Sequence, residues 1–192
     1  MPDRRTRKTK AQLRAALVKL LKKKKINEIT VKEIVEEADI NRSTFYLHYT
    51  DIYDLLNKIE IELLNEFINL TRDYADFHND ANSNYSYLTK LFEILLNNID
   101  IVSILLGPNG DISFLNQIKH MISDKIIEDF NDSSITNSIL DVEYTFSFYL
   151  NGCIGLIEHW IETGVKDSPE HMAKLCYNLI NNGIKSYFDV PW

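Results

Sequence analysis

Glycine and proline are scarce in this chain of 192 residues, which has six glycines and four prolines. These residues fall mostly at breaks between segments of helical periodicity, and the pattern predicts an all-α fold. Long apolar runs are also absent, because the longest uncharged stretch, residues 144–157, is shorter than the roughly 18 residues that span a bilayer. No apolar segment follows the basic N-terminal residues as it would in a secretory signal, so we expect a cytoplasmic protein without membrane contact.

Catalytic and metal-binding signatures are missing as well. The sequence contains no G-x-S-x-G, H-E-x-x-H, Walker or G-x-G-x-x-G motif, and no Glu precedes a His by three residues as in di-iron bundles. We therefore expect that the protein is not an enzyme and that it has no metal site and no cofactor. The two cysteines, Cys153 and Cys176, lie in apolar helical patterns, which favours buried reduced thiols over the alternative of a redox switch.

Charge is distributed very unevenly along the chain. Residues 1–50 carry 13 Lys and Arg against 6 Asp and Glu, whereas residues 51–192 carry 8 against 22. An acidic protein that binds DNA must concentrate its cations locally, and this polarity matches that requirement. We predict a DNA-binding domain over residues 1–50 and a second domain over residues 51–192.

Residues 28–49 have the pattern of two short helices joined by a tight turn. Thr30 followed by Glu33 is a capping box, which predicts that a helix begins near Val31. Asp39 stands where the chain must turn, and Asp tolerates a left-handed backbone better than most residues. Asn41 is a favourable N-cap for a following helix that begins at Arg42. The pattern is typical of a helix-turn-helix reader of DNA.

A first helix is expected over about Thr6 to Lys24, with an apolar stripe at Leu13, Leu17, Leu20 and Leu21. Basic residues open and close it, and the alternatives to phosphate contact are a solvated face or, at the C-terminal end, an interaction with the helix dipole. The opening cluster is the better candidate for phosphate contact and includes Arg4, Arg5 and Lys8.

In the helix that follows Asn41, Phe45 and Tyr49 lie four residues apart and should point inward. The remaining positions are then available on the surface: Arg42, Ser43, Thr44, Tyr46, Leu47 and His48. The alternative is a small three-helix core with an incidental polar face.

The stretch I-T-V-K-E-I-V-E-E-A-D-I-N-R-S-T-F-Y-L-H-Y resembles the signature of the TetR/AcrR-type bacterial transcriptional regulators. This resemblance implies that Thr30 is a phosphate-contacting cap, that Arg42, Ser43 and Thr44 read bases, and that Tyr46 and His48 clamp phosphates. The chain departs from the pattern at Asp39, often Gly, and at Ile52, usually a phosphate-binding Lys. Leu47 replaces a residue that is often basic and could contact a thymine methyl group.

After residue 50, periodicity predicts six more helices, which makes about nine in all. The first begins at an Asp51 cap and continues through Leu70. The others cover residues 87–97, 99–106, 111–130, 137–163 and 169–188, with loops at 76–86, 107–110 and 131–136.

The last two helices are the most apolar and look like an antiparallel hairpin, with Gly164 as a C-terminal glycine and Ser168-Pro169 as the next cap. Pairing with a second copy would give a four-helix homodimer interface, although packing within one chain could also cover these helices. The candidate interface residues are Gly152, Gly155, Leu156, His159, Leu175 and Leu179.

The segments N-G-C-I-G-L-I-E-H-W and L-L-G-P-N-G-D-I-S-F are similar to TetR-type C-terminal domains, in the branch that includes regulators of dihydroxyacetone kinase operons. The resemblance implies a sequence-specific regulator, a repressor or an activator with a co-activator, controlled by a small molecule or a protein partner. A helical adaptor that does not bind DNA is the remaining alternative. Candidate pocket residues, which could equally be plain core, are Tyr87, Leu91, Phe114, Tyr144, Phe148 and Trp160.

Overall fold

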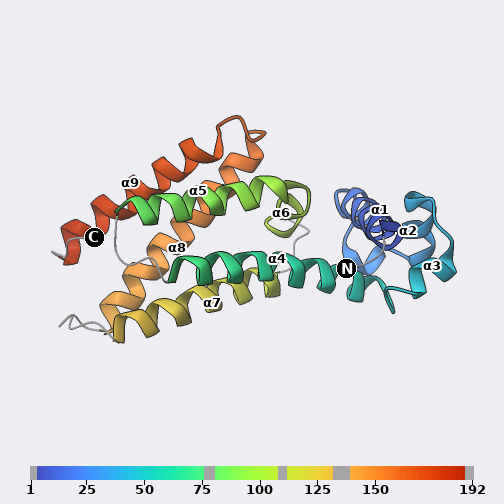
Figure 1. Cartoon of the computed structure of the whole chain (residues 1–192), viewed down its shortest axis with the longest axis horizontal. Coiled ribbons are helices and arrows are strands. Elements are labelled where there is room, and N and C mark those ends of the chain that lie inside the picture. The colour runs from blue at the N-terminus through green and yellow to red at the C-terminus, as the bar shows by residue number, and fades with distance from the viewer. Residues whose placement is uncertain (1–3, 76–80, 108–111, 132–138, 189–192) are drawn as a thin grey trace. The chain divides into compact units, whose positions relative to one another are not determined.

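The computed structural model describes residues 4–75, 81–107, 112–131 and 139–188. Within these ranges the regular structure is entirely helical, as predicted, and comprises nine α-helices and one short 3-10 helix (Figure 1). The helices are α1 (Arg4–Leu21), α2 (Val31–Ala38), α3 (Arg42–Tyr46), α4 (Ile52–Ala75), α5 (Ala81–Asn97), α6 (Ile99–Leu105), α7 (Ile112–Asn131), α8 (Ile139–Glu162) and α9 (Pro169–Phe188). None of these helices, over its described residues, is both long and apolar enough to cross a membrane.

The chain divides into two compact units. The first contains Met1–Asn65 and Asp100–Asp111, and the second contains Glu66–Ile99 and Ile112–Trp192. The division therefore falls inside α4, and α6 joins the N-terminal unit from far along the sequence. The boundary at residue 50, drawn from charge and motif, remains a prediction about which residues meet DNA.

The first unit has a continuous apolar core. Leu13, Leu17 and Leu21 of α1 are at most 1% exposed, as the stripe predicted, whereas Leu20 is only half-buried. Burial of such side chains is the main favourable term in folding, at about 1.5–3 kcal/mol for each large one. The other helices of this unit contribute the buried side chains Ile34, Val35, Phe45, Leu55, Ile59, Ile101 and Val102.

Helix α1 spans Arg4–Leu21, not Thr6–Lys24. The helical hydrogen bonds end in a turn in which the amide of Lys23 donates to the carbonyl of Leu20 at 2.9 Å. The chain then enters the 3-10 helix η1 (Ile26–Glu28). The lysines at positions 22–25 thus follow the helix instead of forming its last turn.

The second unit is built around α5, α8 and α9, and α5 lies alongside α9 (Figure 1). The rings of Phe92 and Trp160 meet edge to face with centroids 5.5 Å apart, and both side chains are buried. The indole nitrogen of Trp160 donates to the carbonyl of Asp167 at 3.0 Å, which ties α8 to the connection that follows it.

The connection between α8 and α9 has the predicted caps. Gly164 has a φ of +85°, and the amide of Val165 donates to the carbonyl of Trp160, which closes the end of α8. The Ser168 hydroxyl accepts from the amide of His171 at 3.3 Å, as expected of an N-cap before Pro169.

One boundary in this unit differs from the expectation. Helix α5 begins at Ala81, so residues 81–86 are helical although their polar composition suggested a loop. Tyr85 shows the tertiary reason, because its ring packs edge to face on Tyr177 of α9. The predicted turn at residues 108–110, the Asp111 cap and the break at 132–136 lie outside the described residues.

Candidate nucleic-acid interface

The N-terminus of α2 carries the predicted capping box. Thr30 has an extended backbone, and its hydroxyl accepts from the amide of Glu33 at 3.3 Å. In return, the Glu33 carboxylate accepts from the amide of Thr30 at 2.9 Å and from its hydroxyl at 2.8 Å. The hydroxyl proton of Thr30 is thus directed at Glu33, and the backbone entering the helix-turn-helix is held by three hydrogen bonds.

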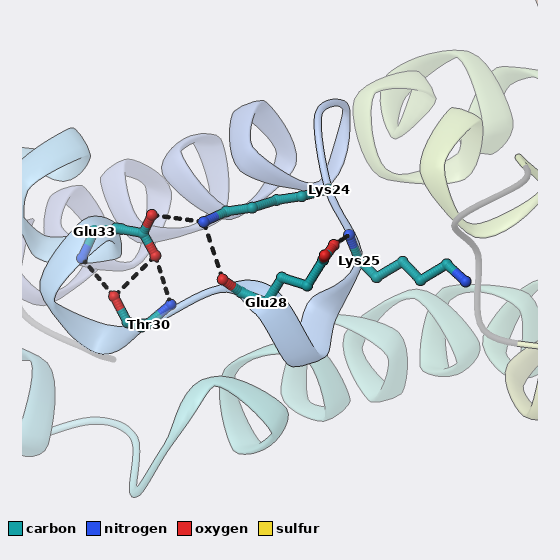
Figure 2. Close-up of polar contacts among 5 residues, drawn as sticks. All are labelled: Lys24, Lys25, Glu28, Thr30 and Glu33. Carbon is teal, nitrogen blue, oxygen red and sulfur yellow. Dashed lines mark hydrogen bonds and ion pairs between the residues drawn. The ribbon is translucent and has the colours of Figure 1, made fainter.

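Lys24 completes this cap. Its ammonium donates to the other carboxylate oxygen of Glu33 and to the carbonyl of Glu28 at 3.0 Å (Figure 2). The hydrogen bond from Lys24, followed by those from Thr30, lowers the pKa of Glu33 to about 2. The carboxylate is therefore ionised at neutral pH and paired with a lysine that the sequence placed in a general basic cluster.

A second reciprocal pattern precedes the first. The amide of Lys25 donates to the Glu28 carboxylate at 2.9 Å (Figure 2). The amide of Glu28 donates to the carbonyl of Lys25 at 3.0 Å. The 3-10 helix η1 was not predicted from the sequence. The spacing of three between Lys25 and Glu28, the same as between Thr30 and Glu33, was the available signal.

The turn between α2 and α3 has the backbone that Asp39 was expected to adopt. Asp39 lies in the left-handed region with φ 52° and ψ 50°, and the amide of Ile40 donates to the carbonyl of Val35 at 3.0 Å. Asn41 occupies the N-cap position as predicted, and its carbonyl accepts from the amide of Thr44 at 2.9 Å. Its side chain, however, makes no capping hydrogen bond.

Helix α3 is anchored from its inner face. Phe45 is fully buried and Tyr49 is 4% exposed, which confirms the inward pair, and their ring centroids lie 5.7 Å apart. Burial, together with nearby carboxylates, raises the pKa of Tyr49 to about 12. The ammonium of Lys58 lies 5.2 Å from the centroid of the Tyr49 ring and donates to the carbonyl of His48 at 3.0 Å.

The opposite face of α3 is open. Arg42 and Ser43 are exposed, Tyr46 is 49% exposed and Leu47 is 79% exposed. Arg42 donates to the Tyr46 hydroxyl at 3.2 Å, and its guanidinium carbon lies 5.6 Å from the centroid of the same ring. Thr44 and His48 are half-buried. The helix ends at Tyr46, so Leu47 and His48 stand in the turn that follows.

The start of α4 explains the departure at position 52. Ile52 is only 7% exposed and belongs to the core, so it offers nothing to a phosphate. Asp51 caps the helix as predicted, accepting from the amide of Asp54 at 2.8 Å, while Asp54 accepts from the amide of Thr50 at 2.9 Å. Lys58 is already held by Asp54 at 2.9 Å.

The N-terminal cations form part of α1. Arg4, Arg5 and Lys8 are exposed on its first turns. Lys10 instead lies 3.4 Å from Glu62 and Arg14 pairs with Asp100. The exposed cations of the first turns therefore remain available to phosphates, while the following two bind carboxylates of their own unit.

The candidate pocket residues do not form one wall. Phe114 and Trp160 are buried in the second unit, and Tyr87 and Leu91 are half-buried. Tyr144 and Phe148, however, are 73% and 74% exposed. The single chain therefore does not enclose these two side chains, and the assignment of the six residues to a ligand pocket stays a prediction.

Several candidate interface residues share the surface with that aromatic pair. Tyr144, Phe148, Gly152, Gly155 and His159 recur at helical spacing and are all exposed. A Cβ atom added at Gly152 or Gly155 would meet nothing within 4 Å. On α9, Leu175 and Leu179 are 39% and 57% exposed, and Leu156 of α8 is half-buried.

A capped helix, a left-handed turn and a short helix with an open polar face, in a unit rich in cations, define a helix-turn-helix DNA-binding protein. Residues 13–59 match the model of the bacterial regulatory proteins of the tetR family, and residues 82–182 match a transcriptional regulator C-terminal region of that family. The chain belongs to the TetR family and is a DNA-binding transcriptional regulator.

The uncharacterized HTH-type transcriptional regulator YxbF of Bacillus subtilis (strain 168) is 41% identical to this chain over 49 residues. That match covers 26% of this chain and 13% of YxbF.

Solved structures share the fold over nearly the whole chain. The fatty acid degradation regulator FadR from Bacillus halodurans has a TM-score of 0.67 at 13% identity and covers 92% of this chain and 96% of its own. FadR from Bacillus subtilis, solved with stearoyl-CoA, has a TM-score of 0.65 at 16% identity, with coverages of 91% and 98%. The dihydroxyacetone kinase operon activator DhaS has a TM-score of 0.60 at 21% identity, with coverages of 94% and 98%.

Proposed function

We propose that the protein is a repressor that binds a pseudo-palindromic operator as a homodimer, with α3 of each protomer in the major groove. The proposal rests on two features of α3, namely its exposed outer face and the buried Phe45 side chain that anchors its inner face. Phe45 holds the helix from inside, while Arg42, Ser43 and Tyr46 point outward. A recognition helix needs both properties, because base contacts require a fixed backbone and accessible donors.

The contacts divide by chemistry. Arg42, Ser43 and Thr44, at the start of α3, read base edges, and Arg42 suits the paired acceptors of guanine. Tyr46 and His48 bind phosphates, and the apolar Leu47 contacts a thymine methyl group. Arg4, Arg5 and Lys8 add phosphate contacts that carry no sequence information. Thr30 caps α2, and the amide groups at the N-terminus of this helix face the phosphate backbone of the operator.

Dimerisation uses the exposed face of α8 and α9. Tyr144 and Phe148 supply exposed aromatic surface, and Gly152 and Gly155 let a partner helix approach closely. A two-fold dimer would present two copies of α3 about 34–36 Å apart, one turn of B-DNA. A dimer with two-fold symmetry therefore requires an operator made of two inverted half-sites.

Control operates on the separation of the two recognition helices. An effector that binds the second unit better in one dimer geometry shifts the DNA-competent population by its differential affinity. A small molecule is the first candidate, and a long-chain acyl-CoA is a direct probe, since the Bacillus subtilis FadR structure contains stearoyl-CoA. A protein partner is the alternative, in which case the chain would act as an activator like DhaS.

Selection of bound fragments from random duplex DNA tests the DNA-binding part. We expect one symmetric consensus, and an affinity that falls steeply with salt, with a slope in log–log form of about −0.9 per phosphate contacted. Arg42→Ala should relax the preference at one position of each half-site. Lys90→Ala is the matched control and should leave the consensus unchanged, because Lys90 is an exposed cation on α5, outside the helix-turn-helix.

No preference for any duplex at low ionic strength, with and without effector candidates, would contradict the operator proposal and favour a protein-binding adaptor. Repression and activation are separated by a reporter placed behind the selected operator. Expression that rises when the protein is removed indicates a repressor.

A further inference from the structure

The two cysteines of this chain lie in contact with each other between α8 and α9 of the second unit. Cys153 lies on α8 and Cys176 on α9, and their sulfur atoms are 3.3 Å apart. Both thiols are free. They are also the complete cysteine content of the sequence, so each has only the other as an intrachain partner.

Contacts on both sides hold this pair in register. Towards the start of α8, the ring of Tyr149 lies against Gly183 of α9, so closely that a Cβ atom there would come within 1.7 Å of the Tyr149 hydroxyl. Towards the hairpin connection, Trp160 donates to the carbonyl of Asp167 at 3.0 Å. The meeting of the two sulfurs therefore follows from the antiparallel packing of α8 and α9.

The two thiols differ in environment. Cys176 is 3% exposed, whereas Cys153 is half-buried and within reach of a small solute. The hydrogen bond between them lowers the pKa of Cys153, and the same bond, together with burial, raises the pKa of Cys176. The greater exposure of Cys153 makes it the thiol that a peroxide reaches first, and the thiolate is the form that reacts.

A metal site is the other common use of two adjacent thiols. A zinc site needs about four ligands. Among the described residues, no three His, Cys, Asp or Glu side chains form a group that could hold a metal ion. A disulfide needs only the two sulfurs, at about 2.05 Å, so each needs to move by less than about 1 Å.

We propose that Cys153 and Cys176 form a dithiol that hydroperoxides convert, reversibly, into an intrachain disulfide joining α8 to α9. This modification site is separate from the helix-turn-helix and does not depend on the proposed repressor function.

The reaction has two steps. The Cys153 thiolate attacks one peroxide oxygen, the O–O bond breaks, and the leaving hydroxide takes up a proton, which leaves Cys153 as a sulfenic acid. The Cys176 sulfur then attacks the Cys153 sulfur, the S–O bond breaks, and the departing hydroxide leaves as water with the proton of Cys176. Two thiols lose two electrons and two protons, and one hydrogen peroxide becomes two waters. A low-molecular-weight dithiol reverses the change by thiol–disulfide exchange.

Peroxide treatment of the reduced, desalted full-length protein tests the proposal. The expected result is a fall from two free thiols per chain to none under denaturing conditions, with a mass loss of two hydrogen atoms. The product should run as a monomer on a non-reducing denaturing gel, and dithiothreitol should restore both thiols. Peptide mapping should find the Cys153–Cys176 crosslink.

Single substitutions test the order of the steps. In Cys176→Ser the reaction should stop at the sulfenic acid of Cys153, which dimedone traps, whereas Cys153→Ser should give little dimedone adduct because Cys176 is buried. The double variant controls for methionine oxidation. Because Cys176→Ser alters a buried position, Cys176→Ala is the second variant, and the measurement on the unaltered chain needs no variant at all.

Three results would overturn the proposal. One is the survival of both thiols at peroxide concentrations that oxidise a model thiol peptide. The second is a gain of oxygen on Cys153 without loss of the Cys176 thiol. The third is a disulfide between two chains in place of the intrachain bond.

Discussion

The ammonium of Lys24 donates a hydrogen bond to the carboxylate of Glu33, nine residues away, and the same carboxylate caps α2 through Thr30. Lys24, which follows α1, thus adds an ion pair to the N-terminal cap of α2, the helix that leads through the Asp39 turn into α3.

This pair gives a pH dependence of stability with a defined sign. The pKa of Glu33 lies at about 2 in the folded protein, below its ordinary value of 4.5. A lowered pKa contributes stability that is complete above pH 4.5 and is lost as the pH falls towards 2. Lys24→Met should raise the pKa of Glu33 and flatten this part of the curve, measured by thermal denaturation and by NMR titration. Lys23→Met, an exposed neighbour, should leave the pKa unchanged. An unaltered Glu33 titration in Lys24→Met would contradict this role.

The contact between Arg42 and Tyr46 separates two contributions to operator binding. Tyr46→Phe keeps the ring beneath the guanidinium but removes the hydroxyl, which should cost about 0.5–1.5 kcal/mol of binding free energy. Arg42→Ala should cost about 1–3 kcal/mol and relax the preference at one base pair. Fluorescence anisotropy on the selected operator measures both changes.

Thermal stability should be unaffected by these two changes, because Tyr46 is half exposed and Arg42 is exposed. If Arg42→Ala weakens all sequences equally, Arg42 is a phosphate contact and the assignment to base reading is wrong.

The open position of Gly155 allows a test of dimerisation that leaves the protomer intact. Gly155→Arg should give monomers by sedimentation, because a large charged side chain on the exposed face of α8 blocks a partner helix. The single chain has room for the new side chain, since a Cβ atom there meets nothing within 4 Å. Glu93→Arg, at an exposed position of α5, is the control and should remain a dimer. A dimer that persists in Gly155→Arg would move the interface elsewhere.

Arg14 and Asp100, far apart in sequence, form a two-pronged ion pair that joins α1 to α6. Nε and Nη2 of Arg14 lie 3.3 and 2.9 Å from the two carboxylate oxygens. The side chains are 26% and 44% exposed, so solvent screening limits the pair to about 1 kcal/mol. Asp100→Asn should lower the melting temperature by about 2–4 °C.

The pair between Lys10 and Glu62 is the matched control for this measurement. It is longer, at 3.4 Å, and more exposed, so Glu62→Gln should change the melting temperature by less than about 2 °C. Equal effects of the two substitutions would mean that the geometry at Arg14 adds nothing.

Local patterns were predictable because their hydrogen bonds join residues only a few positions apart. Thr30 with Glu33, Asp39 in the left-handed region and Phe45 with Tyr49 all behave as their spacing indicated. The Asn41 side chain is an exception, since its residue type predicted a capping bond that the structure lacks.

Partners distant in sequence could not be predicted in this way. Composition placed Lys24 in a basic cluster, but its contact with Glu33 depends on how α1, η1 and α2 turn back on one another. The helical start of α5 was hidden for the same reason, because Tyr177, on which Tyr85 packs, belongs to α9.

The amino-acid sequence by itself determined the helical class, the capped helix-turn-helix and the concentration of cations before residue 50, because periodicity, capping and charge are properties of neighbours along the chain. Only the tertiary structure decided that α6 joins the N-terminal unit, that Tyr144 and Phe148 remain on the surface, and that Cys153 meets Cys176. Those outcomes depend on which faces the folded units bury, and a linear pattern does not specify the partner that covers a face.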